Sequence, residues 1–158
     1  PSICTNCANG CATDVWLRDN QVLRQTPRLN PEVNGHWMCD AGRLGYGKYN
    51  ERRLSGAKAK GDLPVELEEA MAEAARLLSV NKGQTLFIAS AHASLESNYA
   101  LQQFAREQGA SEVVYVPHID PGFGDDFLRK DDRTPNARGC ELLGIKPVSL
   151  EELRARIA

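Results

Sequence analysis

The sequence predicts an α/β protein in which a small β-hairpin-rich module precedes a partial, Rossmann-like parallel α/β domain. Three observations support this fold class. Clustered cysteines and a hairpin pattern fill the first part, a polar stretch follows at residues 55–62, and helical and strand patterns then alternate. Because alternating strands and helices build parallel sheets, we expect two units, residues 1–56 and residues 57–158.

Four cysteines near the start of the chain follow the spacing C-x2-C-x3-C-x27-C. They are Cys4, Cys7, Cys11 and Cys39. A [4Fe-4S] cluster is held by four thiolates, and three on one tight loop with a fourth from afar is a common arrangement. Gly10 in this loop can take the positive φ that wrapping a cluster requires. The spacing predicts that these side chains hold one iron-sulfur cluster.

Two other uses of the same thiols remain open. Tetrahedral Zn²⁺ is also satisfied by four thiolates, although zinc sites usually combine two short C-x2-4-C pairs. Disulfides are typical of short secreted chains, but the trio from Cys4 to Cys11 is too crowded for a loop-closing framework. Three clustered cysteines and one distant cysteine favour the iron-sulfur cluster. A zinc-stapled interaction module is the non-redox alternative.

A β-hairpin is predicted directly after the cysteine loop. Side chains alternate over residues 14–18 and 21–26, on either side of Asp19-Asn20. Turn dipeptides at Asn30-Pro31 and Asn34-Gly35 then return the chain to present the fourth cysteine. A unit of about 50 residues buries little apolar surface unaided, so we expect its folding to depend on metal.

The second unit begins with an amphipathic helix. Residues 66–80 place apolar side chains at helical spacing, which predicts a stripe that packs in the core, Met71 included. Near the end of the chain, residues 136–144 predict a short helix closed by glycine. A capping-box start at residues 149–152 predicts a last helix.

Between these helices the pattern predicts a βαβ unit. Strands are expected at residues 85–91 and 112–117, on either side of a helix over residues 95–108. Ser94 is the expected N-cap, and Gly109 fits the helix end. The two strands are therefore parallel, joined by a right-handed crossover. Because two parallel strands do not make a stable open sheet, either further strands come from elsewhere or this domain is truncated, and truncation is the preferred interpretation.

Composition limits the function classes. Apolar residues make up 42% and charged residues 25%, ordinary values for a chain that buries a core. A net charge of -2 and no basic cluster argue against nucleic-acid binding. No apolar run reaches membrane-spanning length and no signal peptide is evident, so direct membrane insertion is not expected. Because the chain begins at Pro1, we expect an excised fragment or a processed chain.

The residues around the fourth cysteine, NGHWMCDAGRLGY from Asn34 to Tyr46, resemble a known family. They are similar to the N-terminal cluster module of the molybdopterin oxidoreductase superfamily, and more closely to the G-subunit family of bacterial NADH:quinone oxidoreductase, respiratory complex I. The match is specific over residues 1–50. A looser match lies at residues 128–136.

This resemblance implies an electron-transfer module with one [4Fe-4S] cluster. It would work inside a multisubunit NADH-oxidising enzyme and would not be catalytic as an isolated chain. Its partners would be other subunits of a membrane-associated respiratory complex, which places it in the cytoplasm, peripheral to the inner membrane. In this family the extra cluster occurs only in some members and lies off the main electron path, with a structural or electron-storage role.

One departure from the superfamily pattern separates the alternatives. Molybdenum and tungsten enzymes typically carry Cys-x-Lys-Gly-Arg, in which the lysine bridges cluster and pterin, whereas this chain has Ala41 at that position. Alanine offers neither charge nor hydrogen bond, so we do not expect molybdopterin. A fragment of a formate dehydrogenase or nitrate reductase type of enzyme is the pterin-dependent alternative.

Other reactive side chains receive simpler interpretations. Cys140 is expected to pack in the core as a small apolar residue. His36 is expected to be exposed or hydrogen-bonded and not a ligand, because four thiolates already complete the site. His92 and His118 follow predicted strands at the edge where open α/β sheets bind ligands. No nucleophile with an adjacent base and no paired carboxylates indicate a catalytic centre.

Some charged residues are candidates for tuning the reduction potential of the cluster, and others are expected on the surface. Cations near a cluster raise its reduction potential by stabilising the more negative reduced state. The candidates are Arg18, Arg24 and Arg43. The acidic pairs Asp125-Asp126 and Asp131-Asp132 are expected to lie on a solvated loop surface or to contact a partner subunit.

Overall fold

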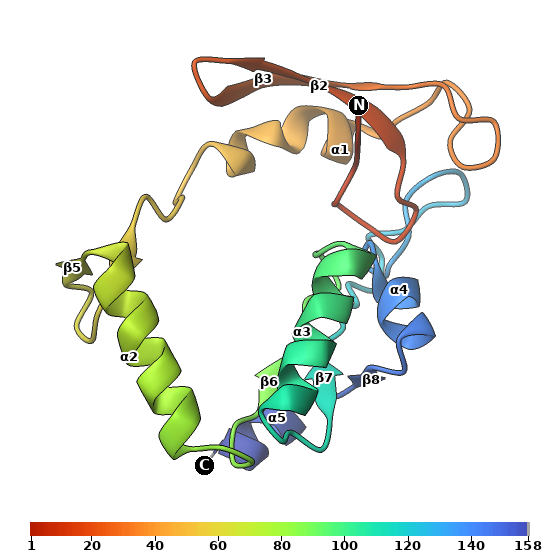
Figure 1. Ribbon diagram of the computed structural model, residues 1–158. Coiled ribbons are helices and arrows are strands. Elements are labelled where there is room, and N and C mark those ends of the chain that lie inside the picture. Colours follow the sequence, from red (N-terminus) through yellow and green to blue (C-terminus); the bar gives the residue numbers. More distant parts are fainter. Residues whose placement is uncertain (158) are drawn as a thin grey trace.

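The computed structural model describes residues 1–157 as a mixed α/β chain, which confirms the predicted fold class. Two three-stranded sheets lie at opposite ends of the molecule, with a two-stranded sheet between them in sequence (Figure 1). The elements of the N-terminal part are β1 (Ser2–Ile3), β2 (Ala12–Arg18), β3 (Gln21–Pro27), α1 (Asp40–Leu44) and the 3-10 helix η1 (Gly45–Tyr49).

The predicted hairpin is confirmed. Strands β2 and β3 pair antiparallel, and Asp19 and Asn20 between them have φ angles of 50° and 59°. Positive φ at both central residues is what a two-residue turn of the twisted hairpin type requires. Strand β1 adds to the other side of β2, so the sheet order is β1-β2-β3. Its two residues are too few to show alternation in the sequence.

The helical segment after the fourth cysteine was not predicted. Helix α1 starts directly after Cys39, which has extended backbone, and it continues into η1. Asn50 at the end of η1 fixes this segment to the hairpin, because its side-chain amide accepts from the Val22 amide at 2.8 Å and donates to the Val22 carbonyl at 2.9 Å. This amide satisfies the backbone of β3 as a neighbouring strand would.

The second part alternates helices and short strands. Its elements are β4 (Ala57–Lys58), β5 (Pro64–Val65), α2 (Leu67–Val80), β6 (Phe87–Ile88), α3 (Leu95–Glu107), β7 (Val113–Tyr115), α4 (Ala137–Leu142), β8 (Lys146–Pro147) and α5 (Leu150–Ile157). The predicted βαβ unit is confirmed, since β6 and β7 are parallel and α3 lies between them. The Ser94 hydroxyl caps α3 by accepting from the Ser97 amide at 3.2 Å.

A third parallel strand corrects the expectation of a two-stranded sheet. Strand β8 pairs with β7, giving the order β6-β7-β8. Adjacent side chains of β7 point to opposite faces. Val113 and Tyr115 pack with residues of α3 and α4, whereas Val114 packs with Val148 and with Leu153 of α5. Helices therefore cover both faces, as in a doubly wound sheet.

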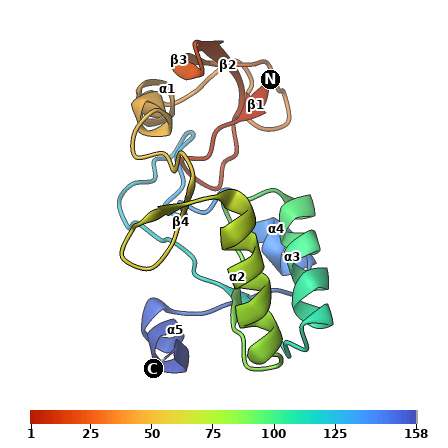
Figure 2. The same ribbon diagram turned by 60° about the vertical axis from the view of Figure 1, so that its left-hand side comes forward.

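Helix α2 forms where the sequence predicts it, but its apolar stripe does not pack in the core. Leu67 is 66% exposed and Met71 is 64% exposed, so the expected core position of Met71 is wrong. Leu78, near the C-terminal end of α2, packs against the hydrophobic core of the α/β part. Figure 2 shows α2 standing beside the α/β layer, with the N-terminal sheet at the other end of the molecule.

Candidate metal centre

The cysteine loop lies between β1 and β2 and buries its three thiols. Cys4, Cys7 and Cys11 are each 5% exposed. The loop closes on itself, because the Cys4 amide donates to the Cys11 carbonyl at 2.8 Å. Gly10 has a φ of 61°, as predicted, and this left-handed residue turns the chain between the second and third cysteines.

Asn34 brings the fourth cysteine to this loop. Its side chain is 4% exposed and accepts from the Ala12 amide at 2.9 Å, next to Cys11. The same amide group donates to the Trp37 carbonyl at 2.9 Å. Because a buried amide needs hydrogen-bond partners, the Asn34 side chain holds the segment before Cys39 against the start of β2.

Asn6 makes a second connection, from the cysteine loop to α1. Its amide nitrogen donates to the Ala41 carbonyl at 2.6 Å, and its oxygen accepts from Lys48 of η1. Thr5 adds a hydrogen bond to the Tyr49 hydroxyl at 2.8 Å. The loop and the helix that follows Cys39 are thereby tied together on both sides of the thiols.

Gly42, in the first turn of α1, lies against two of the sulfurs. A methyl group on this glycine would lie 2.8 Å from the Met38 terminal carbon, 3.0 Å from the Cys4 sulfur and 3.7 Å from the Cys39 sulfur, so Met38 and Cys4 would have to shift to admit it. Cys4 and Cys11 also pack together with Met38. All cysteines of residues 1–157 are free thiols, so no disulfide occupies the four predicted ligands.

Burial sets the acidity of these thiols. It raises the pKa of Cys4 and of Cys11, and the negative charge of the neighbouring thiolates raises both further. The Asn6 amide opposes this shift at Cys4, and the Asn9 side chain does so by donating to the Cys11 sulfur at 3.1 Å. N-H donors therefore oppose the shift at two cysteines. The crowded thiolates need bound cations to neutralise them.

The donor set fits an iron-sulfur cluster. Four thiols on a glycine-lined loop and a helix start are the ligands that a [4Fe-4S] cluster uses. Within residues 1–157, no three His, Cys, Asp or Glu side chains converge tightly enough to coordinate one metal ion.

Two of the three expected tuning cations, Arg18 and Arg24, lie on the hairpin, and the third, Arg43, directly follows Gly42. Arg18 pairs with Asp19 at 3.5 Å on the exposed hairpin turn, and Arg24 stacks on Trp16 with its guanidinium carbon 4.6 Å from the ring centre. Arg43 is exposed on α1. Sequence reasoning missed Arg129, whose pKa is raised first by Asp125 and further by the thiolates of Cys39 and Cys7.

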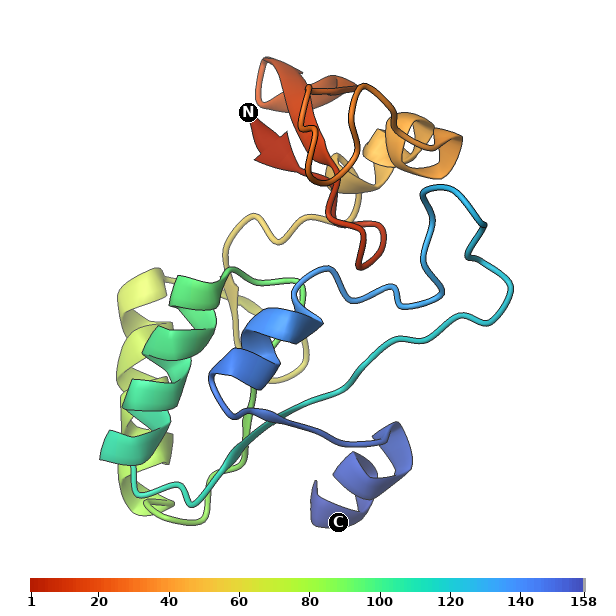
Figure 3. The same ribbon diagram turned by 90° about the vertical axis from the view of Figure 1, so that its right-hand side faces the viewer.

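Arg129 belongs to a long connection of residues 118–134, here called the cover loop. It leaves the carboxyl end of β7, reaches the N-terminal part and returns to α4 (Figure 3). Leu128, which is 8% exposed, packs against Cys4 and Cys11. The irregular sequence of this loop carries no periodic signal. The only hint was the weak family match at residues 128–136.

The acidic pairs lie on the cover loop, where Asp125, Asp126 and Asp131 are exposed as expected, and three of the four carboxylates also accept hydrogen bonds from the loop's own backbone. Asp131 accepts from the Gly124 amide at 2.6 Å, and Asp132 accepts from the Thr134 amide at 2.8 Å. Asp125 accepts from three successive backbone amides, as described below. These carboxylates shape the loop by capping its own backbone.

The remaining singled-out residues lie near their expected places. Cys140 is fully buried in the core of the α/β part, as predicted. His36 is exposed. His92 and His118 follow β6 and β7 at the carboxyl edge of the sheet, and partial burial lowers the pKa of His92, with Lys48 and His118 adding to the effect. These histidines lie between the two parts of the molecule.

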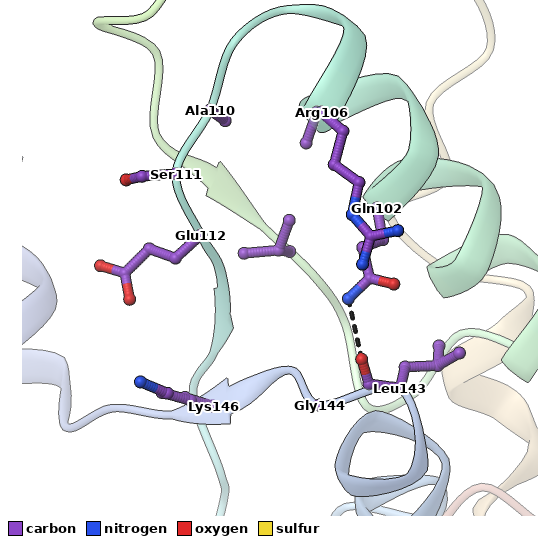
Figure 4. A pocket seen from close by; sticks show the side chains of 10 residues that line it. Gln102, Arg106, Ala110, Ser111, Glu112, Leu143, Gly144 and Lys146 are labelled. Carbon is purple, nitrogen blue, oxygen red and sulfur yellow. Dashed lines mark hydrogen bonds between the residues drawn. The ribbon is translucent and has the colours of Figure 1, made fainter.

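A cavity of about 360 Å³ lies well away from the thiols (Figure 4). It is lined by the end of α3 and by the first residues of β7 and β8, and Gln102 donates across it to the Leu143 carbonyl at 2.8 Å. This is the amino edge of the parallel strands. Open α/β sheets bind ligands at the opposite edge, so we assign this cavity no role.

Among the described residues, no helix is both long and apolar enough to cross a membrane.

The fold and the gathered thiols define the class as an iron-sulfur protein. Residues 1–47 match the family described as the 4Fe-4S domain of NADH-ubiquinone oxidoreductase NDSU1/NuoG-like proteins. This segment therefore belongs to that family of [4Fe-4S] domains, and the resemblance inferred from the cysteine motif is confirmed.

Similarity extends beyond the cluster segment. The chain is 37% identical to the G subunit of NADH-quinone oxidoreductase from Streptomyces coelicolor over 134 residues, which is 81% of this chain and 16% of that protein. The corresponding protein of Escherichia coli K12 is 37% identical over 112 residues, 68% of this chain and 12% of the relative. The Mycobacterium tuberculosis protein of the same name is 35% identical over 137 residues, 81% and 17% respectively. The chain thus spans less than a fifth of these relatives.

Proposed function

We propose that this chain is the iron-sulfur electron-transfer part of a G-type subunit of NADH:quinone oxidoreductase. One observation carries the proposal: four free thiols lie on the cysteine loop and at the start of α1, within a segment of the [4Fe-4S] domain family. The ligands are Cys4, Cys7, Cys11 and Cys39. When bound, the cluster supplies one-electron transfer by tunnelling.

The surrounding residues support this role by hydrogen bonding and burial. Asn9 donates to the Cys11 sulfur, and such donors stabilise the more negative reduced state. Met38 and Leu128 cover Cys4 and Cys11 with apolar surface, which limits access of water and oxygen. The protein groups thus tune and protect a redox centre without taking part in bond chemistry.

Two observations favour this proposal over its alternatives. Residues 1–47 match a family of [4Fe-4S] domains, whereas zinc sites usually combine two short C-x2-4-C pairs. A cubane instead binds each thiolate at a separate iron. Ala41 occupies the position of the bridging lysine in pterin enzymes, and its carbonyl is engaged by Asn6. We therefore propose no molybdopterin at this site.

The cellular setting follows from the relatives, whose names make them subunits of NADH-quinone oxidoreductase. We propose that this chain likewise acts within a multisubunit enzyme, with other subunits as partners, and is not catalytic alone. Its position would be cytoplasmic and peripheral to the inner membrane. We also propose that two units meet near residue 56, where the segment of the cluster family has ended and the linker begins.

Anaerobic reconstitution with iron and sulfide tests the cluster and its ligands. We expect about four irons and four sulfides per chain, and an electron paramagnetic resonance signal after reduction with dithionite. Cys39→Ala should abolish the signal and lower the iron content. Cys140→Ala, which removes the buried thiol outside the site, is the matched control and should retain both. Stoichiometric zinc without iron in anaerobically isolated protein would reject the proposal.

Affinity purification tests the setting. The tagged protein, expressed at its natural level, should co-purify with NADH-dependent quinone reductase activity from detergent-solubilised membranes. Purification with bound pterin and molybdenum or tungsten would favour the pterin-dependent alternative instead.

A further inference from the structure

The cover loop connects the α/β part to the N-terminal part through its backbone and through side-chain contacts. The Ala8 amide donates to the Asp132 carbonyl at 2.7 Å, and the Arg133 side chain donates to the Asn6 carbonyl at 2.7 Å. Trp37 and Phe127 meet edge to face with ring centres 6.2 Å apart. Residues that lie about 90 to 130 positions from the cysteines in sequence therefore form one wall of the site, as Figure 3 shows for the ribbon.

The loop is built to present one short segment to the thiols. Asp125 accepts from the amides of Phe127, Leu128 and Arg129 at 3.0, 2.6 and 2.9 Å. Its second oxygen accepts from the Arg129 Nε at 2.9 Å. These bonds hold the pKa of the Asp125 carboxyl well below its usual range, so the carboxylate is charged at neutral pH. The segment is thus fixed by a turn of its own and does not depend on a neighbouring strand.

Within that segment, Leu128 and Arg129 point to different features of the site. Leu128 packs on Cys4 and Cys11. Arg129 lines, together with Cys39 and Asp40, a hollow of about 420 Å³ between the cover loop and α1. Its guanidinium is about one-third exposed and lies 5.3 Å from the Phe123 ring centre.

We infer that Arg129 is a positioning and tuning residue for the redox centre: its fixed positive charge, held by Asp125 beside Cys7 and Cys39, raises the reduction potential. This inference rests on the proposed function. Adding an electron makes the centre more negative, and a cation at this edge stabilises that state. The carboxylates of Asp125 and Asp40 line the same hollow and reduce the effect of this charge.

The test is the midpoint potential of the reconstituted chain, measured by mediated titration with dithionite and followed by electron paramagnetic resonance. Arg129→Gln removes the charge but keeps a polar side chain. We expect it to lower the equilibrium constant for one-electron reduction about tenfold, which corresponds to about 59 mV. Arg129→Lys keeps the charge and should stay within about threefold of the parent chain. Arg24→Gln removes a cation from the distant hairpin and should leave the potential unchanged.

The outcomes separate this inference from the proposed function. An Arg129→Gln chain with a full iron content and an unshifted potential overturns the inference, while the cluster assignment stands. If Arg129→Gln fails to assemble the centre, Arg129→Lys decides: a near-parental potential supports the inference, and a tenfold shift rejects it. A parent chain that holds no iron fails the proposed function itself.

Discussion

At the scale of single residues, two buried asparagines explain how distant cysteines converge. Asn34 joins the start of β2 to the segment before Cys39, and Asn6 joins the cysteine loop to α1. Each amide satisfies backbone groups that would otherwise be buried without partners. The site is therefore positioned by backbone-directed hydrogen bonds, and the small size of Gly42 lets the sulfurs approach.

Replacing Gly42 by alanine tests this close approach. The added methyl would lie 2.8 Å from the Met38 terminal carbon and 3.0 Å from the Cys4 sulfur. We expect an overpacking cost of about 1–3 kcal/mol, seen as a lower thermal midpoint and less iron per chain after reconstitution. Gly47→Ala is the control, because the nearest atom to its methyl would be 3.9 Å away. Equal iron content in both variants would contradict the packing described here.

At the scale of elements, the sequence was most informative where a local rule applies. The hairpin around Asp19-Asn20, the Ser94 cap of α3 and the positive φ of Gly10 follow from residue chemistry and are present as predicted. The cysteine spacing likewise predicted which thiols come together. Elements that depend on tertiary contacts were missed, namely β1, β8 and the helix after Cys39.

The exposure of α2 and the role of the cover loop also depend on tertiary contacts that the sequence pattern does not show. Periodicity predicts an apolar stripe on α2, but it does not say what covers that stripe, and Met71 is exposed. The cover loop has no periodicity, so Arg129 had no signal of its own in the sequence. Its Asp125 turn is visible only once the backbone amides are placed.

Leu128→Ala tests the cover loop as a barrier over the thiols. Truncation removes the apolar contact with Cys4 and Cys11 and leaves a path for oxygen. We expect the visible absorbance of the reconstituted chain to decay several-fold faster in air, at roughly parental iron content before exposure. Leu142→Ala changes a side chain that is 67% exposed on α4 and should decay at the parental rate. Identical decay of all three chains would show that the cover loop does not protect the site.

At the scale of the whole molecule, Arg133 couples the two parts. Its guanidinium donates to the Asn6 carbonyl at 2.7 Å, pairs with Asp120 at 3.0 Å and lies 3.8 Å from the centre of the Phe123 ring. One partly buried side chain thus joins the cysteine loop to the two ends of the cover loop. The cover loop is anchored in the α/β part because its two ends connect to β7 and α4.

Arg133→Gln should uncouple the parts without unfolding either. Hydrogen bonds to charged groups contribute about 1.5–3 kcal/mol, so we expect hydrogen exchange of the Ala8 amide to quicken about tenfold or more. The core amide of Ala89, which donates to Val114, should exchange at its parental rate. Arg138→Gln removes only an exposed pair with Glu141 and serves as control. Unchanged exchange at Ala8 would argue against this coupling.

The central claim is that four thiols enclose one cubane, and a crystal structure of the anaerobically reconstituted chain, with diffraction data collected at the iron absorption edge, tests it most directly. We predict the four irons of a [4Fe-4S] cluster, each bonded at about 2.3 Å to the sulfur of Cys4, Cys7, Cys11 or Cys39. A single metal ion among the thiols, or Cys39 turned away from an iron-free loop, would contradict the account.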